Sequence, residues 1–462
     1  MEEIFRNIFH MTALDSLIDQ PQFLIMYALA FLLLYLGIKK QYEPLLLIPI
    51  AFGVLIANFP GGDMGVLAVN GEGELFRISN ELLQNGLEGF KYLTFTDGVK
   101  EYHDGFVQIG ALWYDTNVNQ ILQKPELVEH IEVFNIWQMP LHDIAHEFGV
   151  MNFIYYAMIK SGLLPPIIFM GVGALTDFGP MLRNLKLAIF GAGAQFGIFA
   201  VLLVACNFFT LQEAGSLAII GGADGPTAIF TTIKLAPHLL GPIAIAAYSY
   251  MALVPVIVPL VVKLTCSKKE LSINMKQQDK LYPSNTVIKN ERALKIIFPI
   301  AVTTVVAIIV PSAVPLVGML MFGNLIKEVG SSTSRIFDAA SNAVMNSATI
   351  FLGLSVGATM TVDAFLNWTT IGIVAGGFLA FGFSIFGGIM LVKIMNLFSK
   401  KKINPLIGAT GLSAVPMASR VANEIALKYD PRNHVLNYCM SSNVSGVIGS
   451  AVAAGILIAF LG

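Results

Sequence analysis

The chain has 462 residues, of which 55% are hydrophobic and only 13% are charged, and its formal net charge is −2. A soluble globular domain usually carries about 25% charged residues. Apolar runs recur that match the roughly 20 helical residues needed to cross a bilayer. The composition therefore excludes an ordinary soluble domain and predicts a polytopic membrane protein in contact with lipid, with no nucleic-acid partner.

The membrane spans are expected to be helices. Strands of a membrane barrel are short alternating segments of about 10 residues, whereas the runs at 21–38 and 369–392 are continuous. Two helices, at about 21–38 and 44–59, come first along the chain. The predicted fold class is an all-α polytopic membrane protein with about nine or more transmembrane helices and a small soluble insertion.

The insertion lies at 60–149 and is acidic. It holds 14 Asp and Glu against 4 Lys and Arg, a net of −10, so the rest of the chain carries +8. Because basic loops tend to stay in the cytoplasm, the acidic block is expected outside. The basic loops, expected inside, are Lys39–Lys40, Arg183–Lys186, Lys263–Lys295 and Lys393–Lys402.

Further apolar segments follow the insertion and suggest a division of the chain. They lie near 151–182, 187–209, 239–264, 294–326, 338–360, 369–392 and 433–461. The expected parts are the first helices at 1–59, the insertion at 60–149, a first transmembrane repeat at 150–264, a basic loop at 265–292 and a second repeat at 293–462.

Two segments, 215–237 and 403–420, are apolar but interrupted by Gly and Pro. Interrupted segments in corresponding places of two halves mark the binding site of many transporters. A short internal match supports two halves, because 161–175 resembles 311–325 at an offset of 150 residues. Helix counting leaves open whether the halves are inverted.

Asp224 is the main candidate functional residue. It lies in IIGGADGPTAIF, where Gly and Pro would break a helix and free backbone carbonyls. A charged carboxylate at the centre of a membrane costs about 2.5–3.5 kcal/mol even on the lenient scale. Carboxylate, carbonyl and hydroxyl oxygens suit a hard cation such as sodium, and a carboxylate alone suits a proton. The alternative is a polar external loop.

Other polar residues in apolar surroundings are weaker candidates. Tyr250 lies on an apolar helix, where a packing role is the alternative. The run INPLIGATGLSAVPMASR, 403–420, mixes helix breakers with hydroxyls and ends at Arg420, a donor matched to carboxylates or a residue that reaches the headgroups. CMSSNVSG, 439–446, could serve helix packing instead.

These motifs together resemble a known family. GVGALTDFGPML, IIGGADGPTAIF, YSYMALVP and NPLIGATGLSAVPMASR are similar to the integral-membrane beta subunit of the biotin-dependent, sodium-pumping decarboxylases. The oxaloacetate, glutaconyl-CoA and methylmalonyl-CoA decarboxylases share this subunit. The resemblance covers roughly 20–58 and 150–462. It implies two inverted repeats with re-entrant hairpins in a bacterial cytoplasmic membrane.

The resemblance also implies an activity: the subunit decarboxylates carboxybiotin, consumes a proton and exports sodium. The biotin is carried by a soluble carboxyltransferase alpha subunit, and a small gamma subunit completes the complex. A homo-oligomer of the chain is also expected. Residues carried over one by one are Asp224, Ser413 and Asn443 for sodium, Gly408 and Asn404 beside them, Tyr250 for the ion and proton site, and Arg420 for the carboxylate of carboxybiotin.

One rival function and one departure stay open. A stand-alone secondary transporter that exchanges sodium for protons or an organic anion would have a similar site. The 60–149 block is longer than the connection that the resemblance implies, which suggests a lineage-specific outer domain. Within it, His142 and His146 are four residues apart, as in a zinc signature, but Asp143 replaces the usual Glu. A solvated polar helix is the favoured interpretation.

Overall fold

The structure is a computed structural model. It describes residue 17 and residues 21–41, 44–60, 62, 64–67, 132–282, 290–365, 368–414 and 417–462. Between 68 and 131 it describes only the strands given below. The chain divides into two compact units, each described by itself below. Unit 1 comprises 1–33, 49–161 and 353–367, and unit 2 comprises 34–48, 162–352 and 368–462.

Unit 1 contains the described strands, all of them within the acidic insertion. They form two antiparallel sheets, one in the order β2-β1-β7 and one in the order β3-β4-β5-β6. The strands are β1 (Glu74–Ser79), β2 (Phe90–Leu93), β3 (Val99–His103), β4 (Phe106–Ile109), β5 (Leu112–Asp115), β6 (Gln120–Ile121) and β7 (Glu132–Asn135). The predicted insertion is thus a β structure in an otherwise helical protein.

The helices of unit 1 surround this insertion in sequence. α3 (Gln22–Ile38) and α4 (Pro44–Ala57) confirm the first two predicted helices, and each is divided between the two units, at Leu33 and Pro49. After β7 come α6 (Leu141–Ile154) and the π-helix η1 (Tyr155–Lys160). His142 and His146 lie exposed on α6, as expected for a solvated helix.

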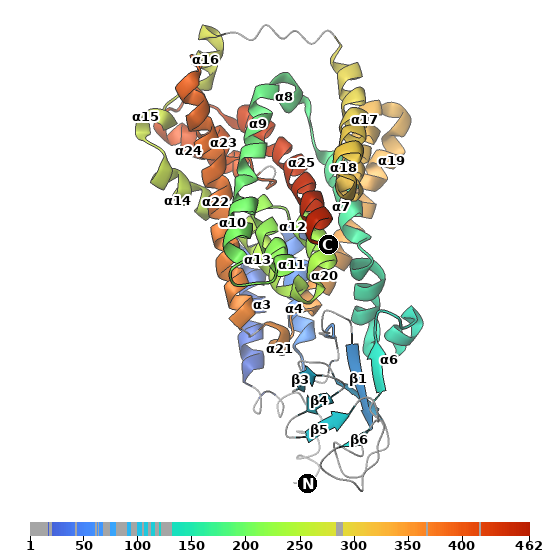
Figure 1. Ribbon diagram of the computed structural model, residues 1–462. Coiled ribbons are helices and arrows are strands. Elements are labelled where there is room, and N and C mark those ends of the chain that lie inside the picture. The colour runs from blue at the N-terminus through green and yellow to red at the C-terminus, as the bar shows by residue number, and fades with distance from the viewer. Residues whose placement is uncertain are drawn as a thin grey trace. The chain divides into compact units, whose positions relative to one another are not determined.

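Unit 2 holds most of the membrane-type helices (Figure 1). From the first half they are α7 (Leu164–Leu175), α8 (Gly179–Arg183), α9 (Leu185–Ala194), α10 (Phe196–Ala205), α11 (Leu211–Ala218), η2 (Ile219–Gly222), α12 (Gly225–Leu235), η3 (Pro237–Leu239), α13 (Leu240–Ala252), α14 (Val254–Thr265), α15 (Lys268–Leu271) and α16 (Met275–Leu281).

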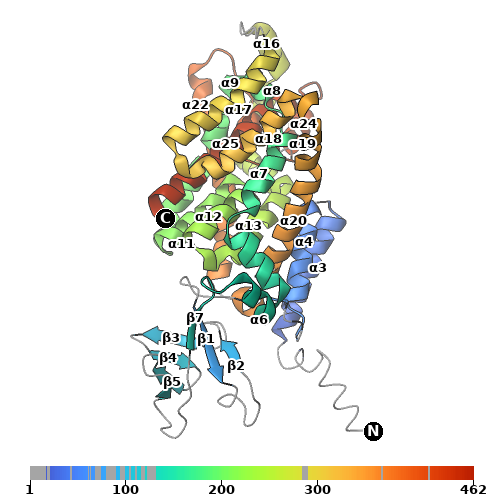
Figure 2. The ribbon, with the colours of Figure 1, turned by 90° about the vertical axis from the view of Figure 1, so that its right-hand side faces the viewer.

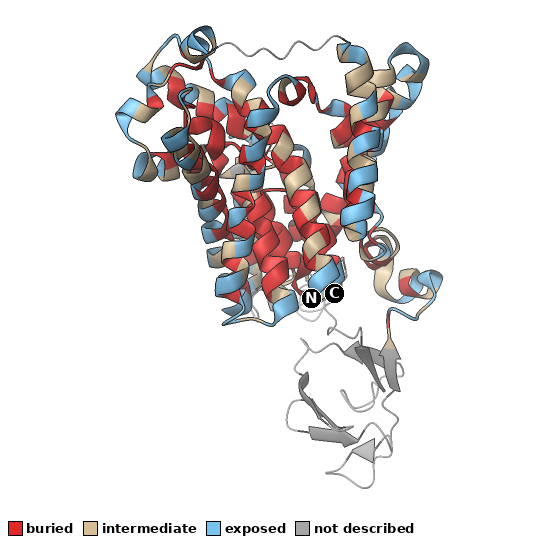
Figure 3. Cartoon of the chain, turned by 45° about the horizontal axis from the view of Figure 1, so that its top comes forward, coloured by how far each residue is buried: buried red, intermediate tan, exposed pale blue. Residues whose placement is uncertain are grey.

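The second half follows the basic loop. Its elements are α17 (Glu291–Ile309), η4 (Pro311–Ala313), α18 (Val314–Val329), η5 (Ser331–Thr333), α19 (Ser334–Asp338), η6 (Ala339–Val344), α20 (Met345–Ala358), α22 (Trp368–Phe398), α23 (Leu406–Ala409), α24 (Met417–Tyr429) and α25 (Leu436–Leu461). The end of α20, from Gly353, and the short α21 (Val362–Phe365) belong to unit 1. Buried residues line the inner sides of these helices and exposed residues their outer sides (Figure 3).

The helices of the described residues confirm a polytopic membrane protein. Six are long and apolar enough to cross a bilayer, and the number rises to eight if each of two bent pairs is one span. The bent pairs are α6–η1 with α7 and η3–α13 with α14; α3 and α4 are shorter apolar helices. The segment predicted as one apolar stretch at 294–326 is two helices, α17 and α18, which the short helix η4 at Pro311–Ala313 separates.

Both interrupted segments are broken helices. Segment 211–235, here called hairpin 1, is α11, η2 and α12; segment 404–429, here called hairpin 2, contains α23 and α24. The long helix α25 shows how they run. Its start contacts hairpin 2, where the Cys439 carbonyl accepts a bond from Thr410. Its end contacts hairpin 1, where Leu461 lies beside Gly215. The hairpins therefore enter from opposite ends of α25 and meet beside its middle.

The internal match at 161–175 and 311–325 has a different meaning from that expected. Helices α7 and α18 pack directly against each other, as Figures 1 and 2 both show. Gly173 lies against the Leu320 carbonyl, and Gly323 against the Met170 carbonyl, so each helix uses a glycine for the same close approach. Met170, Gly173 and Thr176 contact Gly323, Leu320 and Lys327, so every contacting pair is about 150 residues apart, and the two helices are therefore parallel. The match thus coincides with the close packing of two parallel helices.

Candidate functional site

The tip of hairpin 1 places a carboxylate at a helix N-terminus. After the 3-10 turn η2, Ala223 adopts a left-handed conformation with φ 56° and ψ 43°. A non-glycine residue in this region is uncommon, and buried examples cluster at functional sites. The turn makes Asp224 the N-cap of α12. The backbone N–H of Thr227, in the first turn of α12, donates to Asp224 Oδ1 at 3.2 Å. The positive end of the α12 dipole therefore lies at this carboxylate.

Asp224 is the point where three elements meet. Its Oδ2 accepts a hydrogen bond from Ser413 of hairpin 2 at 2.7 Å and one from Ser450 of α25 at 3.2 Å. Only 6% of Asp224 is exposed, and Ser450 is fully buried. A buried charge is stable only when it is hydrogen-bonded or paired. The three donors meet that need with neutral groups, which leaves the carboxylate charge uncompensated by any cationic side chain of the described residues.

The two hairpin tips also bind each other through the backbone. Ser413 N–H donates to the Gly222 carbonyl at 3.1 Å. The tip of hairpin 2 is narrow, because a side chain at Gly411 would overlap the Phe190 carbonyl and one at Gly446 would overlap the Gly411 carbonyl. Glycine at both positions lets hairpin 2 lie between α9 and α25. Close packing therefore accounts for glycine at both positions.

Asn443 supports hairpin 2 from α25 and does not bond to Asp224. Its Nδ2 donates to the Leu412 carbonyl, and its Oδ1 accepts from Ser419 at 3.3 Å. Asn443 and Ser450 are seven residues apart, so they lie on the same face of α25. The residue pair Leu412–Ser413 is thus held between them, and Asn443 contacts the neighbour of Ser413.

Four predicted residues lie away from the carboxylate. Tyr250 donates its hydroxyl to the Val374 carbonyl of α22. Gly408 of hairpin 2 lies against the backbone of Gly388 in α22. Arg420 is exposed on α24 and makes no hydrogen bond or ion pair within the described residues. Asp224 and Ser413 are therefore the predicted residues that the structure joins directly.

Asn404 has a structural position at the base of hairpin 2. It is fully buried, and its Nδ2 donates to the carbonyls of Leu271 at 2.9 Å and Ile273 at 3.0 Å. Its Oδ1 accepts from Leu406 N–H at 3.0 Å. The amide group thus has all its hydrogen-bonding groups in use. It fastens the segment that carries α15 and α16 to hairpin 2.

Sequence reasoning missed Ser450 and Thr227. Ser450 lies in an apolar stretch, SAVAAGILIAF, and only its distance of seven residues from Asn443 could have placed it on the same helix face. Thr227, fully buried, follows Asp224 by three residues, the spacing of an N-cap and the N–H that it accepts.

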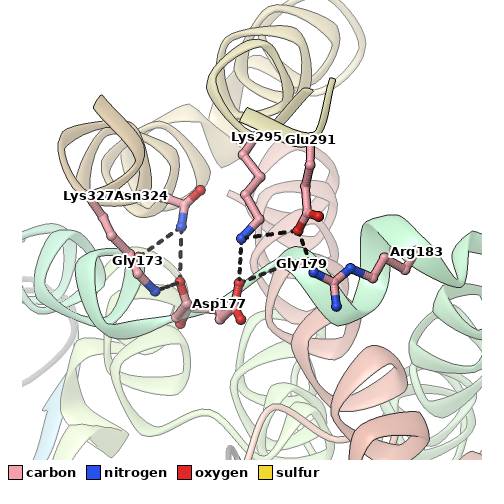
Figure 4. A network of polar contacts seen from close by, with 9 residues as sticks. Gly173, Asp177, Gly179, Arg183, Glu291, Lys295, Asn324 and Lys327 are labelled. Carbon is pink, nitrogen blue, oxygen red and sulfur yellow. Dashed lines mark hydrogen bonds and ion pairs between the residues drawn. The ribbon is translucent and has the colours of Figure 1, made fainter. Parts of the chain in front are cut away.

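A second polar network lies at the ends of α7 and α8 (Figure 4). Asp177 accepts from Gly179 N–H at 2.9 Å and from Lys295 at 3.5 Å, and Glu291 pairs with Arg183 at 2.6 Å. Burial opposes ionisation of Asp177, but the Gly179 N–H and the charges of Lys295 and Lys327 outweigh it and lower its pKa.

This network ties neighbouring helices together. Asn324 and Lys327 of α18 donate to the Thr176 carbonyl at 3.0 and 2.8 Å, which satisfies the end of α7. Both carboxylates of the network, Asp177 and Glu291, pair with cations, and Lys327 binds a backbone carbonyl, so the arrangement is that of a structural contact between helices.

The donors around Asp224 fit a hard monovalent cation. They are the Asp224 carboxylate, the hydroxyls of Ser413 and Ser450, and the nearby Gly222 carbonyl that Ser413 N–H contacts, all oxygen. Within the described residues, no group of three or more His, Cys, Asp or Glu could hold a metal ion. A single carboxylate among neutral oxygens gives a local charge of −1, which one sodium ion or one proton would balance.

Comparisons with known proteins agree with this chemistry. The model of the family described as the Na+-transporting oxaloacetate decarboxylase beta subunit matches residues 22–461. The chain is 43% identical over 446 residues to the oxaloacetate decarboxylase beta chain 2 of Salmonella typhi, covering 95% of this chain and 94% of that one. It is 44% identical over 441 residues to the methylmalonyl-CoA decarboxylase subunit beta of Propionigenium modestum, covering 95% of each.

A third relative covers even more of both chains. The methylmalonyl-CoA decarboxylase subunit beta of Veillonella parvula is 39% identical over 457 residues, or 97% of this chain and 98% of that one. The range matched by the family model runs across the 60–149 insertion. The insertion therefore lies inside the extent of the match and not beyond its end.

Proposed function

Because this chain belongs to the family of the sodium-transporting oxaloacetate decarboxylase beta subunit, we propose that it is the membrane subunit of a primary sodium pump. In this proposal the pump decarboxylates carboxybiotin, consumes a proton and exports sodium. The observation that carries it is the buried Asp224 carboxylate at the meeting point of two broken helices, with hydroxyl donors from hairpin 2 and α25. A site of this kind at a hairpin junction is typical of alternating access.

Sodium, the transported substrate, would bind at Asp224. The Ser413 and Ser450 hydroxyls now donate to Oδ2; on ion binding each can rotate and offer a lone pair instead. Asn443 would act by holding Leu412 and Ser413 in place. A proton on Asp224 would remove the charge that attracts sodium, so proton uptake and sodium release are alternatives at one carboxylate.

Other family positions would act around this site. Carboxybiotin, carried by a partner subunit, would supply the carboxyl group that is lost as CO2. The exposed guanidinium of Arg420 is suited to hold that carboxylate, because its planar donors match the two oxygens. Tyr250 would lie on the proton path only after its hydroxyl leaves the Val374 carbonyl of α22. Asn404 and Gly408 would position hairpin 2 against its neighbours.

The setting proposed for the chain follows from the same family. It would work in the bacterial cytoplasmic membrane with a biotinylated alpha subunit and a small gamma subunit. The parts at 1–59, 60–149, 150–264, 265–292 and 293–462 stay a proposal for its organisation, with the acidic part outside and the basic loop inside. The acyl substrate would be set by the alpha subunit.

The test is co-purification followed by an assay. The tagged chain is purified from native membranes in mild detergent and its partners are blotted with streptavidin. We expect a biotinylated subunit, and decarboxylation of oxaloacetate or methylmalonyl-CoA that is faster in NaCl than in KCl. If no biotinylated protein accompanies the chain and neither substrate is turned over, the stand-alone transporter takes the place of this proposal.

A further inference from the structure

Helix α13 carries two tyrosines with different surroundings. Tyr248 and Tyr250 are two residues apart, so on a helix they point about 200° apart. Tyr250 points to α22, where it contacts Phe378 and Phe381. Tyr248 is only 2% exposed and points to hairpin 1. Of the two, Tyr248 is the one that faces the carboxylate-bearing tip.

The position of Tyr248 follows from the space beside Gly225. A Cβ atom built on Gly225 would overlap Cε1 and Cζ of the Tyr248 ring and would lie 2.7 Å from its hydroxyl oxygen. The phenol end of Tyr248 therefore fills the place of the missing side chain. Gly225 is the first residue of α12 and directly follows Asp224. Neighbouring Cα atoms are about 3.8 Å apart, so the phenol lies next to the residue that bears the carboxylate.

This placement gives the site a further oxygen. A phenol is uncharged near pH 7, donates one hydrogen bond and offers lone pairs. It can thus stabilise an ionised carboxylate as a donor, or a sodium ion as a neutral ligand, without adding a charge. A buried phenol that served packing alone would gain nothing from its hydroxyl, whereas this one brings the hydroxyl to the tip of hairpin 1.

We propose that Tyr248 is a further residue of the sodium site, with a hydroxyl that contributes to cation binding at Asp224, and that Gly225 is glycine to admit it. This inference rests on the proposed function, because it assigns a ligand to the same site. It differs from the role that the family resemblance gives to Tyr250, whose hydroxyl donates to the Val374 carbonyl of α22.

The test measures sodium binding without turnover. A ligand that binds only the folded state raises the melting temperature with its concentration. Detergent-purified chain is melted across a series of NaCl concentrations, with KCl keeping the ionic strength constant. For Tyr248→Phe we expect the sodium concentration of the half-maximal shift to rise about 10-fold, as for loss of one hydrogen bond to a charged group. Melting in KCl alone should stay close to that of the wild type.

Tyr438→Phe is the matched control. Tyr438, at the start of α25, donates its hydroxyl to the carboxylate of Asp279 in α16. Its removal should change melting in KCl and leave the sodium midpoint as it was. A Tyr248→Phe midpoint equal to that of the wild type, or a control that moves as far, overturns the proposal.

Two further variants separate the possible failures. If Tyr248→Phe does not fold, Gly225→Ala replaces it, since the added methyl must displace the ring while the hydroxyl is kept. The same rise in the sodium midpoint is expected, and an unchanged midpoint overturns the role of Tyr248. If wild type and Asp224→Asn both lack any sodium-specific shift, the proposed sodium site itself fails, whatever Tyr248 does.

Discussion

Replacing Ser413 by alanine removes the shortest hydrogen bond to Asp224. The bond from Ser413 Oγ to Asp224 Oδ2 is 2.7 Å, against 3.2 Å for the bond from Ser450. A hydrogen bond to a charged group contributes about 1.5–3 kcal/mol, and 1.4 kcal/mol is a factor of ten in affinity. Since the same hydroxyl would be a ligand of the ion, Ser413→Ala should weaken sodium binding about 10- to 100-fold.

The assay is calorimetric titration of NaCl into the purified chain at constant ionic strength. Ser312→Ala is the matched control, because Ser312 makes a bond of equal length, 2.7 Å, to the neutral Gly455 carbonyl. The control should cost about 1 kcal/mol of stability and leave the sodium affinity unchanged. Ser450→Ala should weaken binding less than Ser413→Ala does. Equal sodium affinity in wild type and Ser413→Ala would refute the assignment of the hairpin junction as the ion site.

Three other outcomes follow from contacts outside the site. Gly173→Ala should lower stability by about 1–3 kcal/mol through overpacking, because its methyl would overlap the Leu320 carbonyl, whereas Gly382→Ala, with nothing within 4 Å, should be harmless in the same melting assay. Because the folded pKa of Asp177 is lowered, the stability that its ionised carboxylate contributes is present above the unfolded pKa of about 3.9 and is lost as the pH falls through the folded pKa. The difference in melting temperature between wild type and Asp177→Asn should therefore be present at pH 6 and shrink below about pH 4. A difference that grows on acidification would contradict this. Asn404→Ala loses two donors to the carbonyls of Leu271 and Ile273, about 2 kcal/mol together, so trypsin should cut the segment with α15 and α16 faster than in the wild type.

The helical membrane fold was predictable because apolar runs of bilayer length can form few other structures. Breaks inside these runs were readable where glycine and proline cluster, as in both hairpins. The strands of the insertion were not foreseen. The match between 161–175 and 311–325 was real but reflects close packing of two parallel helices, since glycine–carbonyl contact imposes similar residues on both.

The candidate site was partly predictable for a similar reason. Asp224 is conspicuous because a carboxylate in an apolar chain is costly, and Ser413 lies in the other broken segment. Ser450 and Tyr248 were missed because one hydroxyl in an apolar helix is common and only the fold decides which face it occupies. Asn404 shows the converse: it lies in a segment of the right kind, yet its amide is occupied by the carbonyls of a distant loop.

Sodium transport by the reconstituted complex tests the central claim most directly. The complex purified through this chain is placed in liposomes with radioactive sodium and supplied with oxaloacetate or methylmalonyl-CoA. The account predicts that sodium accumulates inside the liposomes while the substrate is decarboxylated. It also predicts that Asp224→Asn abolishes the accumulation, while Asp177→Asn, another Asp-to-Asn change outside the site, retains it. Accumulation by Asp224→Asn at the wild-type rate would contradict the account.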